Sequence, residues 1–459
     1  MLRRIAQLFV LMLIAALGLR AWGPSAGARQ IRVMGPSMAP TLLGEHDAWM
    51  CADCRFPFAT GADSAEVGGQ PAVCPNCGRP QPEEVQPRHE PGDRYRIELR
   101  EARGGRPMLR WETIVFRCPE SVEQNHAKPH CIKRVVGLPG ETVELRGGDV
   151  WINGVLARKT LTQQQAMAMV VHDSRFVPRA MDGTLSRWKG AESDSGWVML
   201  GDGSFTYSRT SPREFHASPV QRLGSSPGHP DSPTDRPSKL DWLEYTHWRR
   251  SPEDPARFEP AAIMDDYAYN RDESRRLKRV NDLLLWASIK AVGPSMLAFR
   301  GSVDGHTYVV QLEPRHGRGR LLCDGVLVEG ASFDVKKPLL ASSSHVDFSL
   351  IDHQVQLAID GLLLVNHPCP IENISKKKVA AENAPPFAIG ASELSVTIDS
   401  LTLLRDIYYI APVQPKAVTL GRDEYYVLGD NSPLSADSRS GWPGPGLDRK
   451  YLIGVLQAP

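Results

Sequence analysis

A serine confined between prolines is the first candidate for chemistry. Ser37 lies in the run 34–42, Met-Gly-Pro-Ser-Met-Ala-Pro-Thr-Leu, so its backbone is expected to form a defined turn. An ordinary exposed serine in a loop is the alternative. The tetrapeptide Gly-Pro-Ser-Met is not specific by itself, because it recurs at residues 293–296. Only the first copy continues into Pro-Thr-Leu and follows closely on an apolar segment, which singles out Ser37.

A lysine within an apolar run is the second candidate. Lys133 follows Ile132, and the apolar pair Val135-Val136 comes directly after Arg134. Burial disfavours the charged form of an amine and lowers its pKa, which would make Lys133 a neutral general base. The alternative is a solvated pair of Lys133 and Arg134 at the edge of a strand.

The segment 429–439 combines hydroxyl, carboxylate and guanidinium groups within a short stretch. We expect it either to orient a catalytic amine or to form a polar turn closed by an Asp–Arg pair. The residues concerned are Gly429, Asp430, Asn431, Ser435, Asp437 and Arg439.

Two Cys-x-x-Cys pairs predict a metal centre in an insert of residues 51–91. Cys51 and Cys54 form the first pair, and Cys74 and Cys77 form the second. This spacing is typical of a zinc ribbon, in which four thiolates complete the coordination of a structural zinc ion. An insert of this size has little core of its own and needs such a cross-link. The alternative is a pair of disulfides, which an oxidising compartment favours.

The remaining four cysteines indicate two further cross-links. Cys118 and Cys131 flank the loop that precedes the candidate lysine, and could form a disulfide that steadies it. Cys323 could pair with Cys369 in the same way. Free buried thiols are the alternative for both pairs.

The elements that must position these groups are predicted to be mainly β-strands. Apolar and alternating runs in residues 92–157 predict several strands, and Asn153-Gly154 predicts a hairpin turn. A short helix is expected over 163–171. Residues 240–411 repeat short alternating strands with Gly and Asp turns, which is typical of a β-sandwich. Residues 158–239 include a stretch rich in Ser, Pro, Gly and Asp, and are expected to form a linker or irregular insert.

The composition of the 459 residues fits a globular protein. Apolar residues make up 41% and charged residues 23%, which excludes a wholly disordered chain. The 54 Lys and Arg nearly balance the 53 Asp and Glu, so the net charge is +1. This balance argues against a nucleic-acid-binding protein, which usually carries a basic excess.

The N-terminus carries an apolar run, residues 5–19, behind Arg3-Arg4. Fifteen helical residues cover only about 22 Å, which is short for a membrane span. One interpretation is a cleaved signal peptide with Ala-Gly-Ala at 26–28 as its cleavage site. The other is a retained anchor over residues 1–23, with interfacial Arg and Trp side chains extending the usable span.

The three polar segments, in this order behind an apolar N-terminus, resemble bacterial type I signal peptidases. That family uses a Ser/Lys dyad, so the resemblance implies a serine endopeptidase with Ser37 as nucleophile and Lys133 as general base. It implies that Ser435 helps to orient the lysine, and that five residues give structural support: Gly429, Asp430, Asn431, Asp437 and Arg439. The backbone N–H of Ser37 is the candidate oxyanion donor, since Pro36 has none and Gly35 has no side chain.

The resemblance assigns a discontinuous catalytic core to residues 24–50, 92–157 and 417–459, roughly a third of the chain. The sequence departs from the family where Arg110-Trp111-Glu112 stands in place of the usual Arg-Gly-Asp. It departs further in the two large inserts that interrupt the core. The β-rich insert, 240–411, resembles concanavalin-like or laminin-G-like jelly rolls in its strand pattern. Such sandwiches often bind sugars or proteins, but a fold does not determine a function, so the ligand is left open between a carbohydrate and a protein and no site is assigned.

Signal peptidases keep their N-terminal helix in the cytoplasmic membrane. The resemblance therefore implies that residues 1–23 are a single-pass anchor and that the catalytic domain lies outside the cytoplasm. The expected substrates are exported preproteins cleaved after small residues, without a cofactor for catalysis. Two other interpretations remain open. One is a Ser/Lys protease that processes a narrow set of surface proteins, and the other is an idle scaffold or binding protein.

Overall fold

The protein is described by a computed structural model that covers most of the chain. The described residues are 28–62, 71–100, 107–118, 130–179, 186–208, 239–250, 257–270, 275–370, 385–412, 416–442 and 444–457. The predicted anchor at residues 1–23 lies outside these ranges. Within them, no helix combines the length and apolar character that a membrane crossing requires.

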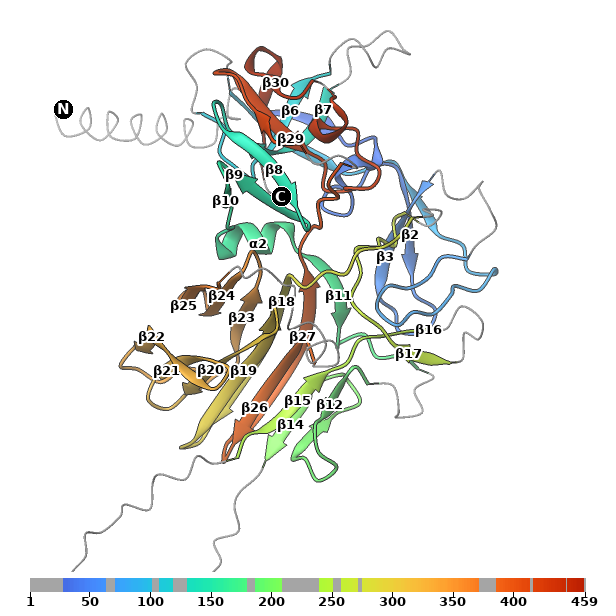
Figure 1. Ribbon diagram of the computed structural model, residues 1–459. Coiled ribbons are helices and arrows are strands. Elements are labelled where there is room, and N and C mark those ends of the chain that lie inside the picture. Colours follow the sequence, from blue (N-terminus) through green and yellow to red (C-terminus); the bar gives the residue numbers. More distant parts are fainter. Residues whose placement is uncertain are drawn as a thin grey trace, which may run out of the picture. The chain divides into compact units, whose positions relative to one another are not determined.

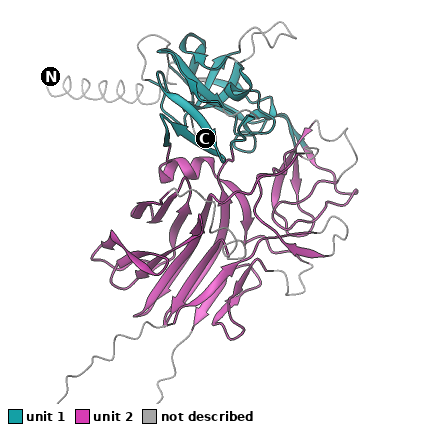
Figure 2. Cartoon of the chain, viewed as in Figure 1, with its two compact units in different colours: residues 1–47, 89–156, 409–459 teal, residues 48–88, 157–408 magenta. Residues whose placement is uncertain are grey.

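The chain divides into two compact units, shown in teal and magenta in Figure 2. Unit 1 comprises residues 1–47, 89–156 and 409–459, and unit 2 comprises residues 48–88 and 157–408. Strands dominate both units, which confirms the mainly β fold class (Figure 1). In the described ranges, the α-helix is α2 (Leu161–Met167), whose N-terminus is closed by a capping box between Thr160 and Gln163.

Unit 1 contains the three polar segments and is built on two antiparallel sheets. The larger sheet runs, in spatial order, β1 (Ala28–Arg32), β5 (Arg94–Leu99), β31 (Leu452–Leu456), β6 (Thr113–Arg117), β7 (His130–Gly137), β29 (Glu424–Leu428) and β30 (Leu447–Asp448). The smaller sheet runs β10 (Val155–Leu156), β9 (Asp149–Ile152), β8 (Thr142–Arg146) and β28 (Val418–Thr419).

The turns of the smaller sheet follow from its glycines and asparagine. Asn153 and Gly154 both adopt positive φ, 51° and 80°, between β9 and β10. This geometry is that of a tight hairpin, which glycine and asparagine tolerate best, and it confirms the predicted turn. The larger sheet is held by a buried cluster in which β6, β7 and β29 contribute Phe116, Val135 and Val427.

Unit 2 is dominated by a β-sandwich of two antiparallel sheets (Figure 1). One sheet runs β13 (Trp197–Met199), β14 (Phe205–Ser208), β27 (Ser395–Arg405), β18 (Leu283–Val292), β23 (Ser344–Leu350), β24 (Gln354–Ile359) and β25 (Leu362–Pro368), with β11 (Met169–Asp173) also paired to β27. The other runs β12 (Trp188–Gly190), β15 (Asp241–Tyr245), β26 (Phe387–Ser392), β19 (Met296–Val303), β20 (His306–Glu313), β21 (Arg318–Cys323) and β22 (Val326–Asp334).

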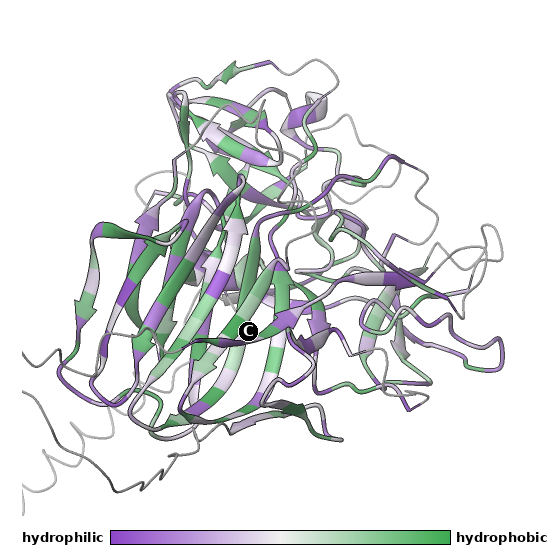
Figure 3. Ribbon diagram, turned by 60° about the horizontal axis from the view of Figure 1, so that its bottom comes forward, coloured by the Kyte–Doolittle hydropathy of each residue, from purple (hydrophilic) through white to green (hydrophobic). Residues whose placement is uncertain are grey.

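Alternation along the strands builds the sandwich core. On β20, Tyr308, Val310 and Leu312 are buried and the residues between them are partly exposed. Figure 3 shows the same alternation as hydrophobic and hydrophilic bands along the strands of the sandwich. Side chains that alternate in this way bury one face of a strand, so the two sheets share one apolar cluster.

The segment 158–239 differs from its predicted irregular character. Its described part contains the predicted short helix, α2, which ends at Met167 because residues 169–173 form β11. It also contributes four strands, β11 to β14, which join the two sandwich sheets. Periodicity did not indicate them because each is only three to five residues long and is separated from the next by Gly, Ser or Asp turns. The sandwich therefore begins well before residue 240.

Two small sheets complete the fold. One pairs β16 (Trp248–Arg250) with β17 (Phe258–Pro260). The other has the order β3 (Pro57–Gly61), β2 (His46–Met50) and β4 (Arg88–Glu90). The chain passes from unit 1 to unit 2 within β2 and returns within β4. The segment between them, 51–87, carries the four paired cysteines and is called the ribbon below.

Candidate catalytic site and metal centre

Ser37 lies in the short 3₁₀ helix η1 (Pro36–Met38) and is partly exposed. The turn is closed by the Ala39 N–H, which donates to the Pro36 carbonyl at 3.0 Å. Asn431, in the C-terminal segment, also holds this turn in place, because its backbone N–H donates to the Ser37 carbonyl at 3.0 Å. The Asn431 side-chain amide donates to the Pro36 carbonyl, also at 3.0 Å. Hydrogen bonds from within the turn and from Asn431 therefore both stabilise the turn that holds the candidate nucleophile.

Lys133 lies on β7 opposite Ile114 of β6, and only 5% of its side chain is exposed. It forms no ion pair with any residue in the described ranges. Its ammonium lies 5.9 Å from the centroid of the Trp442 ring. Burial lowers the pKa of Lys133 from 10.5 to about 8; Asp437 and Asp430 oppose this shift, and Arg439 adds to it. The predicted apolar setting is confirmed, and the alternative of a solvated strand-edge lysine is wrong.

An apolar cluster brings the serine turn and the lysine strand together. Met38, next to the serine, and Ile132, next to the lysine, pack in one cluster with Val33 and Leu42. The helix η1 and the strand β7 are in direct contact. Residues that are about a hundred positions apart in the sequence thus lie side by side because their apolar neighbours share one core.

Gly429 occupies a position where no side chain fits. A Cβ atom there would lie 2.2 Å from Ser435 Oγ and 2.4 Å from the Ser37 carbonyl oxygen. The Ser435 hydroxyl is buried and has no hydrogen-bond partner among the described residues. The backbone of the candidate nucleophile and the hydroxyl of Ser435 therefore both pack against this glycine.

Two buried ion pairs hold the segment 429–439 in place. Arg134, next to the lysine, binds Asp430 through two hydrogen bonds, Nε to Oδ1 at 2.8 Å and Nη2 to Oδ2 at 2.5 Å. Arg439 binds Asp437 in the same bidentate way, at 2.8 and 2.7 Å. Asp437 also accepts the Gly429 N–H at 3.0 Å. Both pairs lie inside the protein, where bidentate geometry is needed to offset the loss of hydration.

Unit 1 therefore brings all three predicted segments to one place. Sequence reasoning missed two contributors. Arg134 was considered only as a possible solvated neighbour, although its buried partner Asp430 was already a candidate. Trp442 carried no motif, and only its position three residues after Arg439 could have drawn attention to it. The arrangement supplies a hydroxyl in a rigid turn, an amine of lowered pKa and a buried second hydroxyl.

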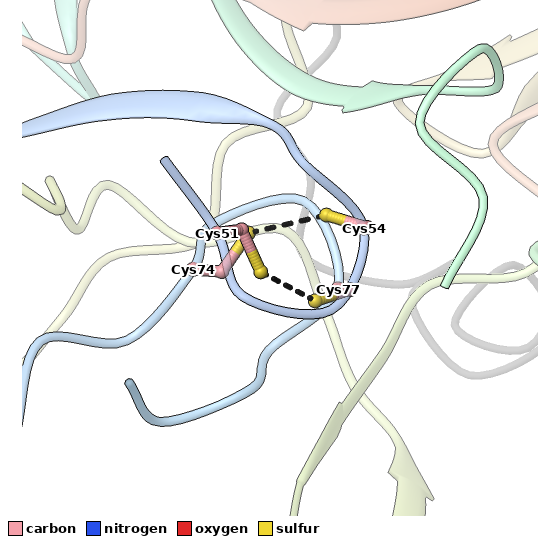
Figure 4. A group of neighbouring side chains, drawn as sticks. All are labelled: Cys51, Cys54, Cys74 and Cys77. Atoms are coloured by element: carbon pink, nitrogen blue, oxygen red, sulfur yellow. Dashed lines mark hydrogen bonds between the residues drawn. The ribbon is translucent and has the colours of Figure 1, made fainter. Parts of the chain in front are cut away.

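The four ribbon cysteines form one buried cluster (Figure 4). Cys51 Sγ lies 3.6 Å from Cys77 Sγ, and Cys54 Sγ lies 3.7 Å from Cys74 Sγ. A disulfide requires about 2.05 Å, so the alternative of two disulfides is wrong for this structure. Tetrahedral zinc with Zn–S bonds of about 2.3 Å places its sulfurs about 3.8 Å apart, which matches the observed spacing.

The surroundings of the cluster also fit a metal–thiolate centre. The amides of Gln81 and Asn76 reach Cys51 Sγ and Cys54 Sγ at 3.6 and 3.9 Å. Each Cys-x-x-Cys pair lies in a turn closed by a backbone hydrogen bond, and Gly78 adopts the positive φ of 67° that the second turn needs. Donors directed at thiolate sulfur are the usual outer shell of such sites. The cluster is compatible with structural zinc, which would complete its shell with these four ligands.

Cys54→Ser is expected to release the metal and loosen the ribbon while the sandwich stays folded. Zinc bound by four thiolates contributes much of the folding free energy of small ribbons, about 10 kcal/mol or more. Metal content by atomic absorption should fall from one zinc per chain to none, and residues 51–87 should become sensitive to protease. Cys369→Ser, which replaces a free buried thiol of the sandwich, is the control and should keep its zinc. Full zinc content in Cys54→Ser would place the metal elsewhere.

The other four cysteines divide into one disulfide and two thiols. Cys118 and Cys131 are bonded, with their Cα atoms 5.4 Å apart, which confirms that prediction. The predicted bond between Cys323 and Cys369 is wrong, because neither cysteine forms a disulfide. The Tyr308 side chain interacts with both sulfurs. Each thiol thus has the phenol as a neighbour instead of a cross-link.

Comparison with known proteins gives two matches to peptidases. The family described as "Signal peptidase, peptidase S26" matches residues 72–198, which include Lys133 but neither Ser37 nor Ser435. Signal peptidase I of Leptolyngbya laminosa is 48% identical over 50 residues, covering 10% of this chain and 25% of that protein. Together these matches support the peptidase S26 family. The chain spans only a quarter of the length of the curated relative that it matches.

Solved structures resemble the chain only distantly. A carbohydrate-binding module from Bacillus subtilis has 9% identity and a TM-score of 0.26, covering 48% of this chain and 96% of its own. A Bacillus licheniformis β-glucanase has 10% identity and a TM-score of 0.26, covering 52% of this chain and 97% of its own. These values carry no argument about function.

Proposed function

We propose that this protein is a membrane-anchored serine endopeptidase that removes signal peptides from exported preproteins after small residues. Ser37 is the nucleophile and Lys133 is the general base. The observation that carries the proposal is the buried Lys133, which forms no ion pair among the described residues and whose pKa is lowered to about 8, on the strand that contacts the Ser37 turn. The peptidase S26 match supports the same reaction class.

The reaction follows from the two side chains. The neutral Lys133 amine takes the proton of the Ser37 hydroxyl, and the oxygen attacks the carbonyl carbon of the scissile peptide. The resulting intermediate collapses to an ester on Ser37 Oγ, and the leaving amine takes the proton from the lysine. Water then attacks the ester, with the same amine accepting its proton. The Ser37 N–H is the oxyanion donor from this turn, since Pro36 lacks one.

The supporting residues have distinct positioning roles in this proposal. The Ser435 hydroxyl, which has no hydrogen-bond partner among the described residues, is the group that would hold the lysine amine in one orientation. Gly429 keeps the space between Ser435 and the serine turn open. The ion pairs of Asp430 and Asp437 fix the segment that carries both. None of these residues is a catalytic residue in its own right.

The cellular setting is part of the same proposal. Residues 1–23 are the single-pass anchor in the cytoplasmic membrane, and the two units are extracytoplasmic. The disulfide between Cys118 and Cys131 supports an oxidising compartment. The substrate binds as an extended chain that pairs with strand edges beside the dyad.

A narrower substrate range is the second candidate function. Unit 2, residues 48–88 and 157–408, is larger than the peptidase unit into which it is inserted. A sandwich of this size offers a second surface for recognition of particular surface proteins. The same dyad chemistry would then act on few substrates.

The decisive experiment is cleavage of a preprotein with an Ala-x-Ala site by the full chain in detergent. Wild type should give a product whose new N-terminus, read by mass spectrometry, follows the second alanine. Ser37→Ala should give none. Ser295→Ala, in the second Gly-Pro-Ser-Met copy, is the matched control and should cleave like wild type. Activity in Ser37→Ala would refute the dyad, and inactivity of wild type on several preproteins would favour the narrow-specificity function.

The pH dependence of cleavage should follow the protonation state of Lys133. Lys133 must be neutral to accept a proton, so kcat/KM should rise with pH up to about 8 and level off above it. Below that pH the neutral fraction, and therefore the rate, should fall about tenfold per pH unit. An ordinary exposed lysine would move the rise to about pH 10.4. Rates measured from pH 6 to 10 on a short peptide substrate check this, and a profile that falls with rising pH would contradict it.

A further inference from the structure

Two neighbouring strands of the sandwich carry a histidine, a cysteine and an aspartate at one end. Strands β20 and β21 are antiparallel neighbours, and Tyr308 of β20 pairs directly with Cys323 of β21 (Figure 1). His306 begins β20, two residues before Tyr308, so its side chain lies on the same face of the sheet as those of Tyr308 and Cys323. Asp324 follows Cys323 in the turn to β22. The fold therefore brings three candidate metal ligands to the same end of the sheet.

The turns beside these residues have a defined backbone. Asp304 and Gly305 join β19 to β20, and Asp324 and Gly325 join β21 to β22; all four have positive φ, between 50° and 81°. This is the geometry of tight type I′ hairpins. The Asp324 carboxylate is also held in place, because its Oδ1 accepts the Thr307 N–H at 2.8 Å. The backbone thus positions the three side chains without the help of an ion.

The side chains converge on one another. One ligand atom from each of His306, Cys323 and Asp324 lies within 4.8 Å of the other two. His306 Nδ1 lies 2.7 Å from Asp324 Oδ2, and the buried Tyr308 side chain interacts with the Cys323 sulfur. Atoms that bind one zinc ion at about 2.0–2.3 Å lie at most about 4.6 Å apart. Small side-chain rotations are therefore enough for all three residues to contact one ion.

The chemistry of this set selects the kind of ion. Zinc binds imidazole nitrogen, thiolate sulfur and carboxylate oxygen, which are the three groups present here. Calcium and magnesium prefer oxygen ligands, and only Asp324 supplies one among the three. The Asp324 side chain is 47% exposed and that of His306 is 15% exposed, so an ion can enter from the solvent. The four ribbon cysteines, by contrast, are all buried.

We propose that His306, Cys323 and Asp324 form a second metal site, which binds zinc reversibly. The Cys323 thiol gives its proton to the solvent when its sulfur binds the ion. Three protein ligands leave the fourth position of a tetrahedral ion to water. An ion held in this way exchanges more readily than one held by four buried thiolates, so dialysed protein is expected to keep only the zinc of the ribbon. The site is independent of the proposed peptidase activity. The rival explanation is a hydrogen bond between His306 and Asp324 beside an unrelated thiol.

Titration of the dialysed full-length protein with cobalt(II), a spectroscopic substitute for zinc, tests the proposal. One cobalt should bind per chain, and its bond to the thiolate should produce a charge-transfer band in the near ultraviolet. Zinc should then remove the band by competition, whereas the same concentration of calcium should not. Absence of the band, or equal competition by calcium, would overturn the proposal. Release of one zinc per bound cobalt would place the cobalt in the ribbon and would overturn it too.

Variants identify the ligands. Cys323→Ser should remove the band, and His306→Ala should weaken cobalt binding at least tenfold. Cys369→Ser is the matched control for the thiol, since the Cys369 sulfur also interacts with Tyr308. His316→Ala is the control for the imidazole, because His316 lies in the turn at the other end of the β20–β21 hairpin, where it contacts Glu313. Both controls should bind cobalt like wild type. A band that persists in Cys323→Ser, or unchanged affinity in His306→Ala, would overturn the assignment.

Discussion

Lys133→Met is expected to abolish cleavage without making the protein less stable. Loss of a base that works as a unit with its nucleophile costs about 10⁴-fold in rate or more. The free energy of unfolding, in contrast, should rise. The lowered pKa means that the folded protein holds its proton on this lysine less tightly than the unfolded chain does. Below pH 8 the buried ammonium therefore opposes folding, by about 3 kcal/mol for a fall from 10.5 to about 8. Methionine removes that cost.

A second buried lysine provides the control. Lys159 of unit 2 is 4% exposed, like Lys133, but it contacts Asp352 at 2.6 Å and Asp406 at 2.9 Å. Burial alone lowers its pKa, but the two carboxylates raise it above its ordinary value. Lys159→Met should keep full cleavage activity and lose about 3–5 kcal/mol of unfolding free energy, since it leaves buried carboxylates unpaired.

Cleavage rates and urea-dependent hydrogen exchange, analysed separately for peptides of each unit, measure both effects. A Lys133→Met protein that cleaves at the wild-type rate would refute the general base. A Lys133→Met protein whose unit 1 unfolds at lower urea would show that the ammonium stabilises the fold. Neither result is compatible with a desolvated catalytic amine.

Arg134→Met should destabilise unit 1 by about 3–5 kcal/mol. Asp430 is fully buried and depends on Arg134 for two of its hydrogen bonds. Removal of the guanidinium takes the charged bidentate partner from this buried carboxylate, and the Trp111 carbonyl loses one donor. The free energy of unfolding of unit 1, from the same urea-dependent exchange, measures the loss.

Two further variants show whether the loss comes from the unpaired charge. Arg134→Met combined with Asp430→Asn removes both charges and should recover part of the stability. Arg146→Met breaks an exposed pair with Glu144 in the same unit, and no measurable change is expected. A double variant as unstable as Arg134→Met alone would assign the loss to packing instead of charge.

Local patterns predicted much of unit 1 and of the ribbon because they act over short distances. Val135 and Val427 lie in short runs that are buried throughout, Asn153-Gly154 forms a hairpin, and the Cys-x-x-Cys pairs converge on one cluster. In each case a few neighbouring residues decide the outcome. The lysine was also predictable, because an apolar strand around Lys133 leaves its amine little access to water.

Pairing between distant segments was not predictable in the same way. Strands β12 to β14 are short and join the sandwich only through partners such as β27 and β15. Cys323 ends β21 and Cys369 follows the end of β25, and sequence could not show that Tyr308 interacts with both sulfurs. The Arg134–Asp430 pair joins residues 296 positions apart. Such contacts depend on the tertiary fold, which no local pattern encodes.

The bond between the Asn431 side chain and the Pro36 carbonyl spans 395 positions of sequence. Synthesis proceeds from the N-terminus, so the serine turn emerges from the ribosome long before the segment that fastens it. All of unit 2 is made in the interval. A nascent chain therefore carries the proposed nucleophile before the segment that holds its turn has been made, and the proposed site is assembled only after residues 429–439 have folded back onto that turn.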